Sequence, residues 1–262
     1  MQDAWIDYST LNLQENCHVE NLIAARRFNH QLKISRINAP TDRDRWFMTP
    51  QTVNAYYHPS LNEIVFPAAI LQAPFFDPEA DEAVNFGSLG AVVGHEMTHG
   101  FDDQGRKYDS SGNMRDWWNS RDGPEYEARV AVMIKQAEQF QVHGKQLNGK
   151  LTCGENIADL GGVKLALRAL KKVLAEQETQ GAPSPLLNGF TPVQRFFLAW
   201  SQAWRENVKK ERALQLVTLD PHGPNEMRCN GTLSNIQEFF DAFQMTSQDP
   251  MFVEESLRVD IW

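Results

Sequence analysis

The sequence is poor in cysteine and contains no long apolar run. Its 262 residues include three cysteines, Cys17, Cys153 and Cys229, so at most one internal disulfide can form and a disulfide-rich scaffold is excluded. Sparse cysteine favours a reducing, cytoplasmic compartment, and a secreted or extracytoplasmic ectodomain is the alternative. No apolar stretch approaches the roughly 18 residues that cross a bilayer. We therefore expect no membrane-spanning segment in this chain.

An excess of positive charge is also missing. The chain carries 25 Lys and Arg against 34 Asp and Glu, a net charge of −9, which gives no electrostatic support for binding the phosphates of nucleic acids. Hydrophobic residues make up 42% of the chain and include 7 Trp and 15 Phe, which need buried positions. This composition excludes overall disorder and predicts a globular protein that does not bind nucleic acid.

Helical periodicity dominates the sequence, with one exception near the beginning. Two short runs rich in Val, Ile, Phe and Tyr, at 52–57 and 63–66, predict a β-hairpin. The expected helices cover residues 13–34, 67–71, 83–101, 124–141, 154–177, 192–207, 211–216 and 234–243. Residues 181–192 are typical of a linker. We expect an α+β fold that is mainly α-helical, with a small early β-sheet and no βαβ units.

The strongest chemical signal is His-Glu-x-x-His within VVGHEMTHG at 92–100. His95 and His99 are four residues apart, about one helical turn, so both rings leave the same face and can share one cation. Imidazole nitrogens suit zinc. Glu96 should lie beside the metal, where it can take a proton from a water that the metal activates. The alternative is a helix that merely carries two histidines and a glutamate.

A catalytic zinc needs three protein ligands, so a further donor is expected on another element. Glu155 is the candidate, in GENIADLGG near the start of an expected helix. Asp159 follows four residues later on the same face and can accept the free ring N–H of a zinc-binding histidine. The alternative is an exposed helix face, against which the surrounding glycines and apolar residues argue.

Five stretches extend this pattern over most of the chain. They read VNAYY at 53–57, EIVFPAAILQAPFF at 63–76, GHEMTHGFDDQG at 94–105, GENIADLGG at 154–162 and DPHGPNEMRCNGTLSN at 220–235. In these stretches, and in their order from about Asn54 to Trp262, the chain resembles the neprilysin-type zinc endopeptidases, which are thermolysin-like enzymes with a glutamate as third ligand. The resemblance implies a thermolysin-like catalytic domain with one zinc ion, held by His95, His99 and Glu155.

The resemblance also implies roles for residues around the metal. Glu96 is implied as the general base, and Asp159 as the residue that orients a ligand histidine. His222 matches the family histidine that donates a hydrogen bond to the oxyanion, and Asp220 would set its protonation. Without the resemblance, His222 beside Pro221 would be interpreted as a turn residue.

Further matches concern the substrate. Asn54 and Ala55 match the residues that bind the substrate main chain, and Arg228 matches the arginine that holds the carbonyl of the residue after the scissile bond. A surface salt bridge is the alternative for Arg228. The family lines an apolar specificity pocket at positions matching Ile70, Phe75, Val92 and Trp204. This implies cleavage before a large hydrophobic residue, and core packing is the alternative for these four.

The resemblance is incomplete in two respects. Family members are longer, with a mainly helical N-terminal region that caps the active site, so it implies that a lid region is absent from this chain and that residues 1–262 form the catalytic part. The cysteine that animal members carry three residues before the final tryptophan is also missing here. Cys153 lies two residues from a candidate ligand, and we expect a buried side chain there.

We therefore expect a zinc metalloendopeptidase that hydrolyses oligopeptides by attack of a zinc-bound water, with Glu96 as general base. Two alternatives remain. The first is a peptide-binding module without turnover. The second is a structural zinc site, which would require four protein ligands where only three are evident.

Overall fold

The computed structural model describes residues 6–182 and 184–261, and the chain divides into two compact units, Met1–Thr49 and Pro50–Trp262. The first unit contains α1 (His18–Ser35), none of whose side chains is buried. The sequence predicted this helix from residue 13, five positions early. Apolar side chains such as Val19 and Ile23 are exposed.

The second unit holds all the candidate site residues. Its helices are α2 (Glu82–Asn85), α3 (Ala91–Thr98), α4 (Asp122–Ala137), α5 (Cys153–Thr179), α6 (Pro192–Ala203), α7 (Lys210–Leu219) and α8 (Gln237–Phe243). Its strands are β1 (Tyr56–His58), β2 (Glu63–Val65), β3 (Gln141–Val142) and β4 (Lys145–Gln146). Shorter helical turns are η1 (Ala68–Ile70), η2 (Phe86–Gly90), η3 (His99–Phe101), η4 (Gly105–Lys107), η5 (Met227–Gly231) and η6 (Glu255–Leu257). The expected mainly helical α+β fold is confirmed.

One helical run from Glu82 to Phe101 carries the two histidines. It begins at Asp81, whose side chain accepts a hydrogen bond from the N–H of Ala83 and caps α2. It continues through the π-helical turn η2 into α3 and ends in the 3₁₀ turn η3. Single π turns inside helices are frequent near functional sites, because they re-aim the side chains that follow. The helix expected over 83–101 is thus present, with an irregular middle.

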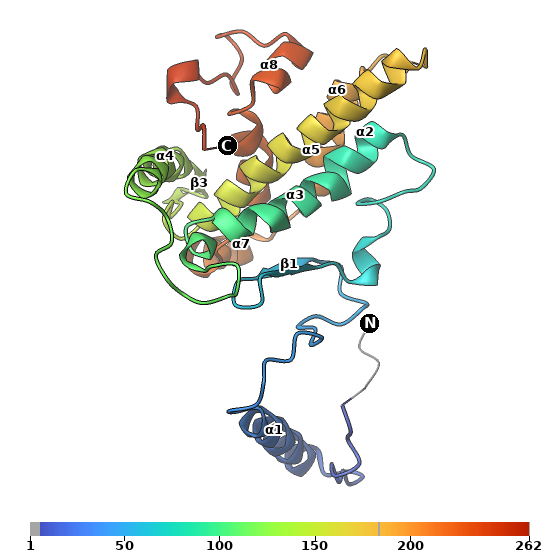
Figure 1. Cartoon of the computed structure of the whole chain (residues 1–262), viewed down its shortest axis with the longest axis vertical. Helices are drawn as coiled ribbons and strands as arrows, with labels where there is room; N and C mark the ends of the chain where they lie inside the picture. Colours follow the sequence, from blue (N-terminus) through green and yellow to red (C-terminus); the bar gives the residue numbers. More distant parts are fainter. Residues whose placement is uncertain (1–5, 183, 262) are drawn as a thin grey trace. The chain divides into compact units, whose positions relative to one another are not determined.

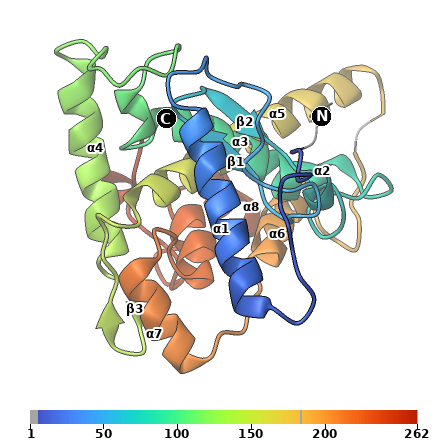
Figure 2. The same ribbon diagram turned by 90° about the horizontal axis from the view of Figure 1, so that it is seen from below.

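The centre of the unit is the crossing of α3 and α5, which lie side by side in Figures 1 and 2. The two helices run antiparallel, since Gly94 meets Gly162 while His95 meets Asp159, three residues earlier on α5. A Cβ atom on Gly94 would lie 2.7 Å from the carbonyl oxygen of Gly162, closer than side chains tolerate. The two glycines therefore allow the backbones to touch, which brings the side chains of one turn of α5 within reach of those of α3.

Apolar packing surrounds this crossing on several sides. The first two-thirds of α5 is buried, with Ile157, Leu160 and Val163 fully enclosed. In both views α4 lies on one side of the unit and α6 on the other. Phe196 and Trp200 of α6 join the same core cluster as α5. Fully burying side chains of this size contributes about 1.5–3 kcal/mol each, so the crossing sits in a rigid setting.

Two sequence expectations are wrong in this unit. The helix expected over 124–141 ends at Ala137, and residues Gln141–Gln146 form a second hairpin, β3–β4, besides the expected β1–β2 pair. His143 and Gly144 connect its strands with φ of 49° and 81°. Two left-handed residues in succession form the tight turn that matches strand twist. The helix expected to Asn207 likewise ends at Ala203.

Across residues 6–182 and 184–261, we find no helix with the length and apolar character that crossing a bilayer requires. The 27 residues of α5 include several lysines and glutamates beyond the buried segment.

Replacing Gly162 with Ala should destabilise the unit. The added carbon would lie 2.6 Å from both the Ala91 oxygen and the His95 nitrogen, and overpacking of this kind costs about 1–3 kcal/mol. Urea unfolding followed by circular dichroism measures the change. Gly123→Ala is the matched control, because a carbon added there would meet its nearest neighbour only at 3.9 Å. Equal stability of Gly162→Ala and the parent would contradict the close crossing.

Candidate active site

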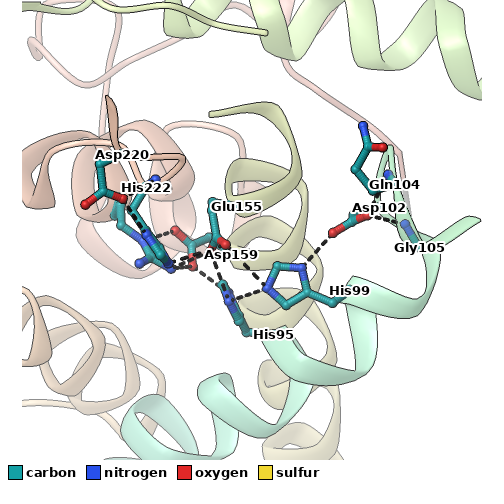
Figure 3. A network of polar contacts seen from close by, with 10 residues as sticks. His95, His99, Asp102, Gln104, Gly105, Glu155, Asp159, Asp220 and His222 are labelled. Atoms are coloured by element: carbon teal, nitrogen blue, oxygen red, sulfur yellow. Dashed lines mark hydrogen bonds and ion pairs between the residues drawn. The ribbon is translucent and has the colours of Figure 1, made fainter. Parts of the chain in front are cut away.

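Two imidazole rings from the helical run face each other at the core of the site. His95 is buried on α3, and His99 begins η3 one turn later. Their Nε2 atoms are 2.9 Å apart, and the rings meet edge to face at 87°. Figure 3 shows both rings directed at Glu155.

Each ring is held from behind by a carboxylate. The Nδ1 of His95 lies 2.8 Å from Oδ1 of Asp159, and the Nδ1 of His99 lies 2.7 Å from Oδ2 of Asp102. A carboxylate accepts hydrogen bonds, so each Nδ1 carries the proton and donates it. In neutral rings the two Nε2 atoms then present lone pairs to each other at 2.9 Å. This arrangement is unfavourable unless a cation lies between the rings.

Glu155 completes the cluster from the first turn of α5. Its Oε2 is buried with no hydrogen-bond partner among the described residues, 3.3 Å from Nε2 of His95. Its Oε1 lies 3.7 Å from Nε2 of His99. The three ligand atoms lie within 4.8 Å of one another. Two imidazole nitrogens and a carboxylate oxygen are the donors that catalytic zinc takes, so these residues fit the metal.

Within the cluster, neighbouring charges outweigh the effect of burial on the pKa values of His95 and Glu155. Burial acts to lower the pKa of His95, but the carboxylates of Asp159 and Glu155 outweigh it and raise this pKa to about 9. Burial acts to raise the pKa of Glu155, and His95, His99 and Arg228 instead bring it to about 2. These opposite shifts favour a proton on His95 beside an ionised Glu155, and a divalent cation bound here would displace that proton, as expected for metal binding that releases protons.

Glu96 lies next to His95 on α3 and is 5% exposed. Burial raises its pKa, against the lowering influence of the two histidines and Arg228. Among the described residues, no cationic side chain forms an ion pair with Glu96. A buried, unpaired carboxylate with a raised pKa is suited to accept and release a proton.

Arg228 supports the site from the π turn η5. Its Nε and Nη2 donate to the two oxygens of Asp159 at 2.8 Å and 2.7 Å, and its guanidinium lies over the ring of Trp204 at 4.1 Å. Burial acts to raise the pKa of Asp159, but the charge and hydrogen bonds of Arg228 bring it to about 2. The surface salt bridge considered for Arg228 is wrong, because this pair is buried.

His222 approaches the cluster from the loop between α7 and η5. Its Nε2 lies 3.3 Å from Oε1 of Glu155, while its Nδ1 lies 2.7 Å from Oδ1 of Asp220. The backbone N–H of His222 donates to the same oxygen at 2.9 Å. Figure 3 shows this loop on the side of Glu155 opposite to Asp102. The side chain of His222 is 48% exposed, so its ring borders solvent as well as the cluster.

The remaining predicted residues are more scattered. Asn54 is exposed and Ala55 buried, and both precede β1, which contacts α3. Of the four expected pocket residues, Trp204 lines a cleft together with Arg228 and His222. The other three do not line this cleft: Ile70 is buried in η1, Phe75 is half-buried in a loop and Val92 is half-buried on α3.

Asp102 was not predicted as a site residue. It lies within the family stretch at 94–105, and an aspartate three residues after a candidate ligand histidine is within reach of its ring. Oδ1 of Asp102 also accepts hydrogen bonds from the N–H groups of Gln104 and Gly105, at 2.8 Å and 2.6 Å. These bonds hold the carboxylate of Asp102 in place, and this carboxylate in turn orients the ring of His99.

Comparison with known proteins agrees with this geometry. The family model described as Peptidase family M13 matches residues 54–259. The chain belongs to peptidase family M13. Its 54–259 match covers nearly all of the Pro50–Trp262 unit and includes every candidate site residue. The resemblance inferred from the sequence motifs is confirmed.

Curated and solved relatives within the family share this unit. The chain is 43% identical over 255 residues to Neprilysin-3 of Drosophila melanogaster and 41% identical over 234 residues to human endothelin-converting enzyme 1. These matches cover 97% and 89% of this chain, but only 32% and 30% of the relatives. The inhibitor complex of Mycobacterium tuberculosis zinc metalloprotease Zmp1 superposes with a TM-score of 0.94 at 45% identity, covering 99% of this chain and 40% of that one. The M13 chain thus spans about a third of its curated relatives.

Changing Asp102 to Asn should weaken zinc binding by about 10–100-fold, because an amide NH₂ placed against Nδ1 of His99 disfavours the tautomer with a free Nε2. Competition with a zinc chelator measures the dissociation constant. Asp103→Asn is the control, since Asp103 bonds Gln104 and neither histidine. If both variants bind zinc as tightly as the parent, Asp102 does not orient the ligand.

Proposed function

We propose that this M13 chain contains the catalytic unit of a zinc endopeptidase that hydrolyses peptide bonds of oligopeptides. The observation that carries the proposal is the pair of Nε2 atoms at 2.9 Å, each ring fixed by a carboxylate behind it. Beside them lies the buried Oε2 of Glu155, 3.3 Å from Nε2 of His95 and without a hydrogen-bond partner among the described residues. Bound by His95, His99 and Glu155, zinc would supply Lewis acidity that polarises a carbonyl and activates water.

Glu96 is the proposed general base. Its buried carboxylate takes a proton from the attacking water and transfers it to the leaving amine as the C–N bond breaks, so the carboxylate is restored at the end of the cycle. Burial supports this role, because the raised pKa of Glu96 makes its ionised form a stronger base. The absence of an ion pair to a described residue leaves both oxygens available.

His222 is the proposed donor to the developing oxyanion. Its Nε2 faces the cluster, and the carboxylate of Asp220 lies against Nδ1 and orients the ring. A donor aimed at charge that develops only in the transition state raises kcat rather than affinity.

Substrate contacts complete the proposal. Asn54 and Ala55 precede an edge of the β1–β2 hairpin, where an extended peptide can add as a further strand. Arg228 would hold a substrate carbonyl in addition to Asp159. We propose cleavage on the N-terminal side of large hydrophobic residues. Its support is the half-buried ring of Trp204 beside Arg228.

The proposal places the chemistry in Pro50–Trp262 rather than in the whole 1–262 span expected from the sequence. The compact unit and the family match share this boundary to within a few residues. We also propose that a helical lid region limits access to the site, and the support for it is that the match covers only 32% of the curated relative Neprilysin-3.

The two rival functions make different demands. A structural zinc site would need a fourth protein ligand, and the cluster found among the described residues has three members. Cys153 is buried at the start of α5 and is not one of them. A peptide-binding module without turnover would not require a buried unpaired carboxylate at Glu96, and this favours the enzyme.

Glu96→Gln should retain zinc and lose turnover by about 10²–10⁴-fold, because the amide cannot accept the proton. Glu155→Ala should lose the metal itself. Elemental analysis gives zinc per chain, and a quenched-fluorescent peptide with Phe or Leu after the scissile bond gives turnover. Glu79→Gln, an exposed loop change, is the control. Loss of zinc from Glu96→Gln would show that the division of roles is wrong.

His222→Ala should lower kcat by about 10²–10³-fold with little change in zinc content, since His222 borders the cluster without being one of its three ligands. The same peptide assay measures kcat and KM separately. His30→Ala on α1 is the matched control for loss of an exposed imidazole. Unchanged kcat would remove His222 from the mechanism.

A further inference from the structure

A cleft of about 620 Å³ opens beside the candidate site, and we call it the α7 cleft. Its lining includes Asp220, His222 and Arg228, which belong to the site or support it, together with Trp204 and residues of α7. Because His222 and Arg228 belong both to the lining and to the candidate site, the cleft adjoins the place where the scissile bond would lie.

The walls of the α7 cleft combine an aliphatic part with charged and polar groups. The aliphatic part comprises Val142 of β3, Val208 of the preceding loop, and Ala213, Leu216 and Val217 of α7. Val208 is 36% exposed, so this apolar wall is open to solvent. Charged groups, including Arg205 and Glu206, line the cleft as well. Apolar walls with a few polar groups and a volume of 300–1,000 Å³ are typical of ligand sites.

Helix α7, which lines the cleft, is packed against several other elements. Val217 is buried in a small core cluster with Ala137, Leu147 and Met227, which ties α7 to the end of α4 and to η5. Strands β3 and β4 contact α7 as well. A hollow between rigidly packed elements keeps its shape, and this allows it to select among occupants.

We propose that the α7 cleft binds an aliphatic side chain of the substrate peptide that does not flank the scissile bond, and so selects longer peptides with an apolar residue at that distance. The inference rests on the proposed function and adds a selective subsite to it. The place of His222 and Arg228 in both the lining and the candidate site identifies the occupant as the same peptide. The aliphatic part of the walls identifies the type of residue.

The first experiment compares two peptide lengths on the zinc-loaded full chain. A short quenched peptide spans only the scissile bond, and longer ones carry Leu or Asp at successive positions outward on either side. In the parent, Leu at one position should raise kcat/KM by about tenfold over Asp, as expected for burying one aliphatic side chain. No preference at any position would overturn the proposal.

The second experiment fills the cleft. Ala213→Phe places a ring into the hollow, whereas Gln215→Phe adds the same ring on an exposed part of α7 that does not line it. The ratio of kcat/KM for the best long peptide to that for the short one should fall about tenfold in Ala213→Phe and stay at the parent value in Gln215→Phe. Equal ratios in both variants would overturn the proposal. Thermal unfolding confirms that each variant folds.

A binding measurement separates failure of the cleft from failure of the proposed function. If the chain cleaves neither peptide, the endopeptidase proposal fails, and anisotropy of the labelled long peptide still reports on the cleft. Binding weakened about tenfold by Ala213→Phe alone supports the subsite. If Ala213→Phe instead changes the oligomeric state in sedimentation velocity while peptide binding stays at the parent value, a second copy occupies the cleft and the proposal is wrong.

Discussion

The contact between Gly94 and Gly162 is the constraint on which the site depends. With hydrogen in place of a side chain at both positions, the backbones of α3 and α5 approach until a Cβ atom would clash at 2.6–2.7 Å. At that separation the short carboxylate of Asp159 reaches Nδ1 of His95, and Glu155, one turn earlier, reaches its Nε2. A wider crossing would lengthen these contacts, because α5 carries the carboxylates and α3 carries the His95 ring.

Two chains of hydrogen bonds hold the His95 and His99 rings in place at this close helix crossing. One runs from His95 through Asp159 to Arg228, whose guanidinium lies on Trp204. The other runs from His99 through Asp102 to backbone N–H groups of its own turn. Buried charges are costly unless they are paired and hydrogen-bonded, and each member of the first chain satisfies its neighbour. The rings are therefore held in one orientation by these contacts alone.

The sequence reveals the parts of this site that depend on local spacing. His95 and His99 share a face because a helix repeats every 3.6 residues, and the same rule relates Glu155 to Asp159. The family motifs extend this to His222 and Arg228. Sequence reasoning did not find the two hydrogen bonds from Arg228 to Asp159, residues that are 69 positions apart. It also missed the β3–β4 hairpin, whose turn has a left-handed His143. Such features depend on tertiary contacts and backbone conformation, which periodicity does not encode.

The two sides of the cluster differ in how firmly they are held. His95 and His99 are fixed by carboxylates and a packed core, whereas His222 stands on a loop, half exposed, with Asp220 as the partner of its Nδ1. A metal ligand gains from rigidity, because displacement weakens every bond to the ion. A side chain that donates to charge developing on a substrate must be able to adjust its position. His222 lines the α7 cleft, whose open volume allows such movement. The fold thus places its tightest packing behind the proposed metal ligands and its open volume where we propose that a peptide binds.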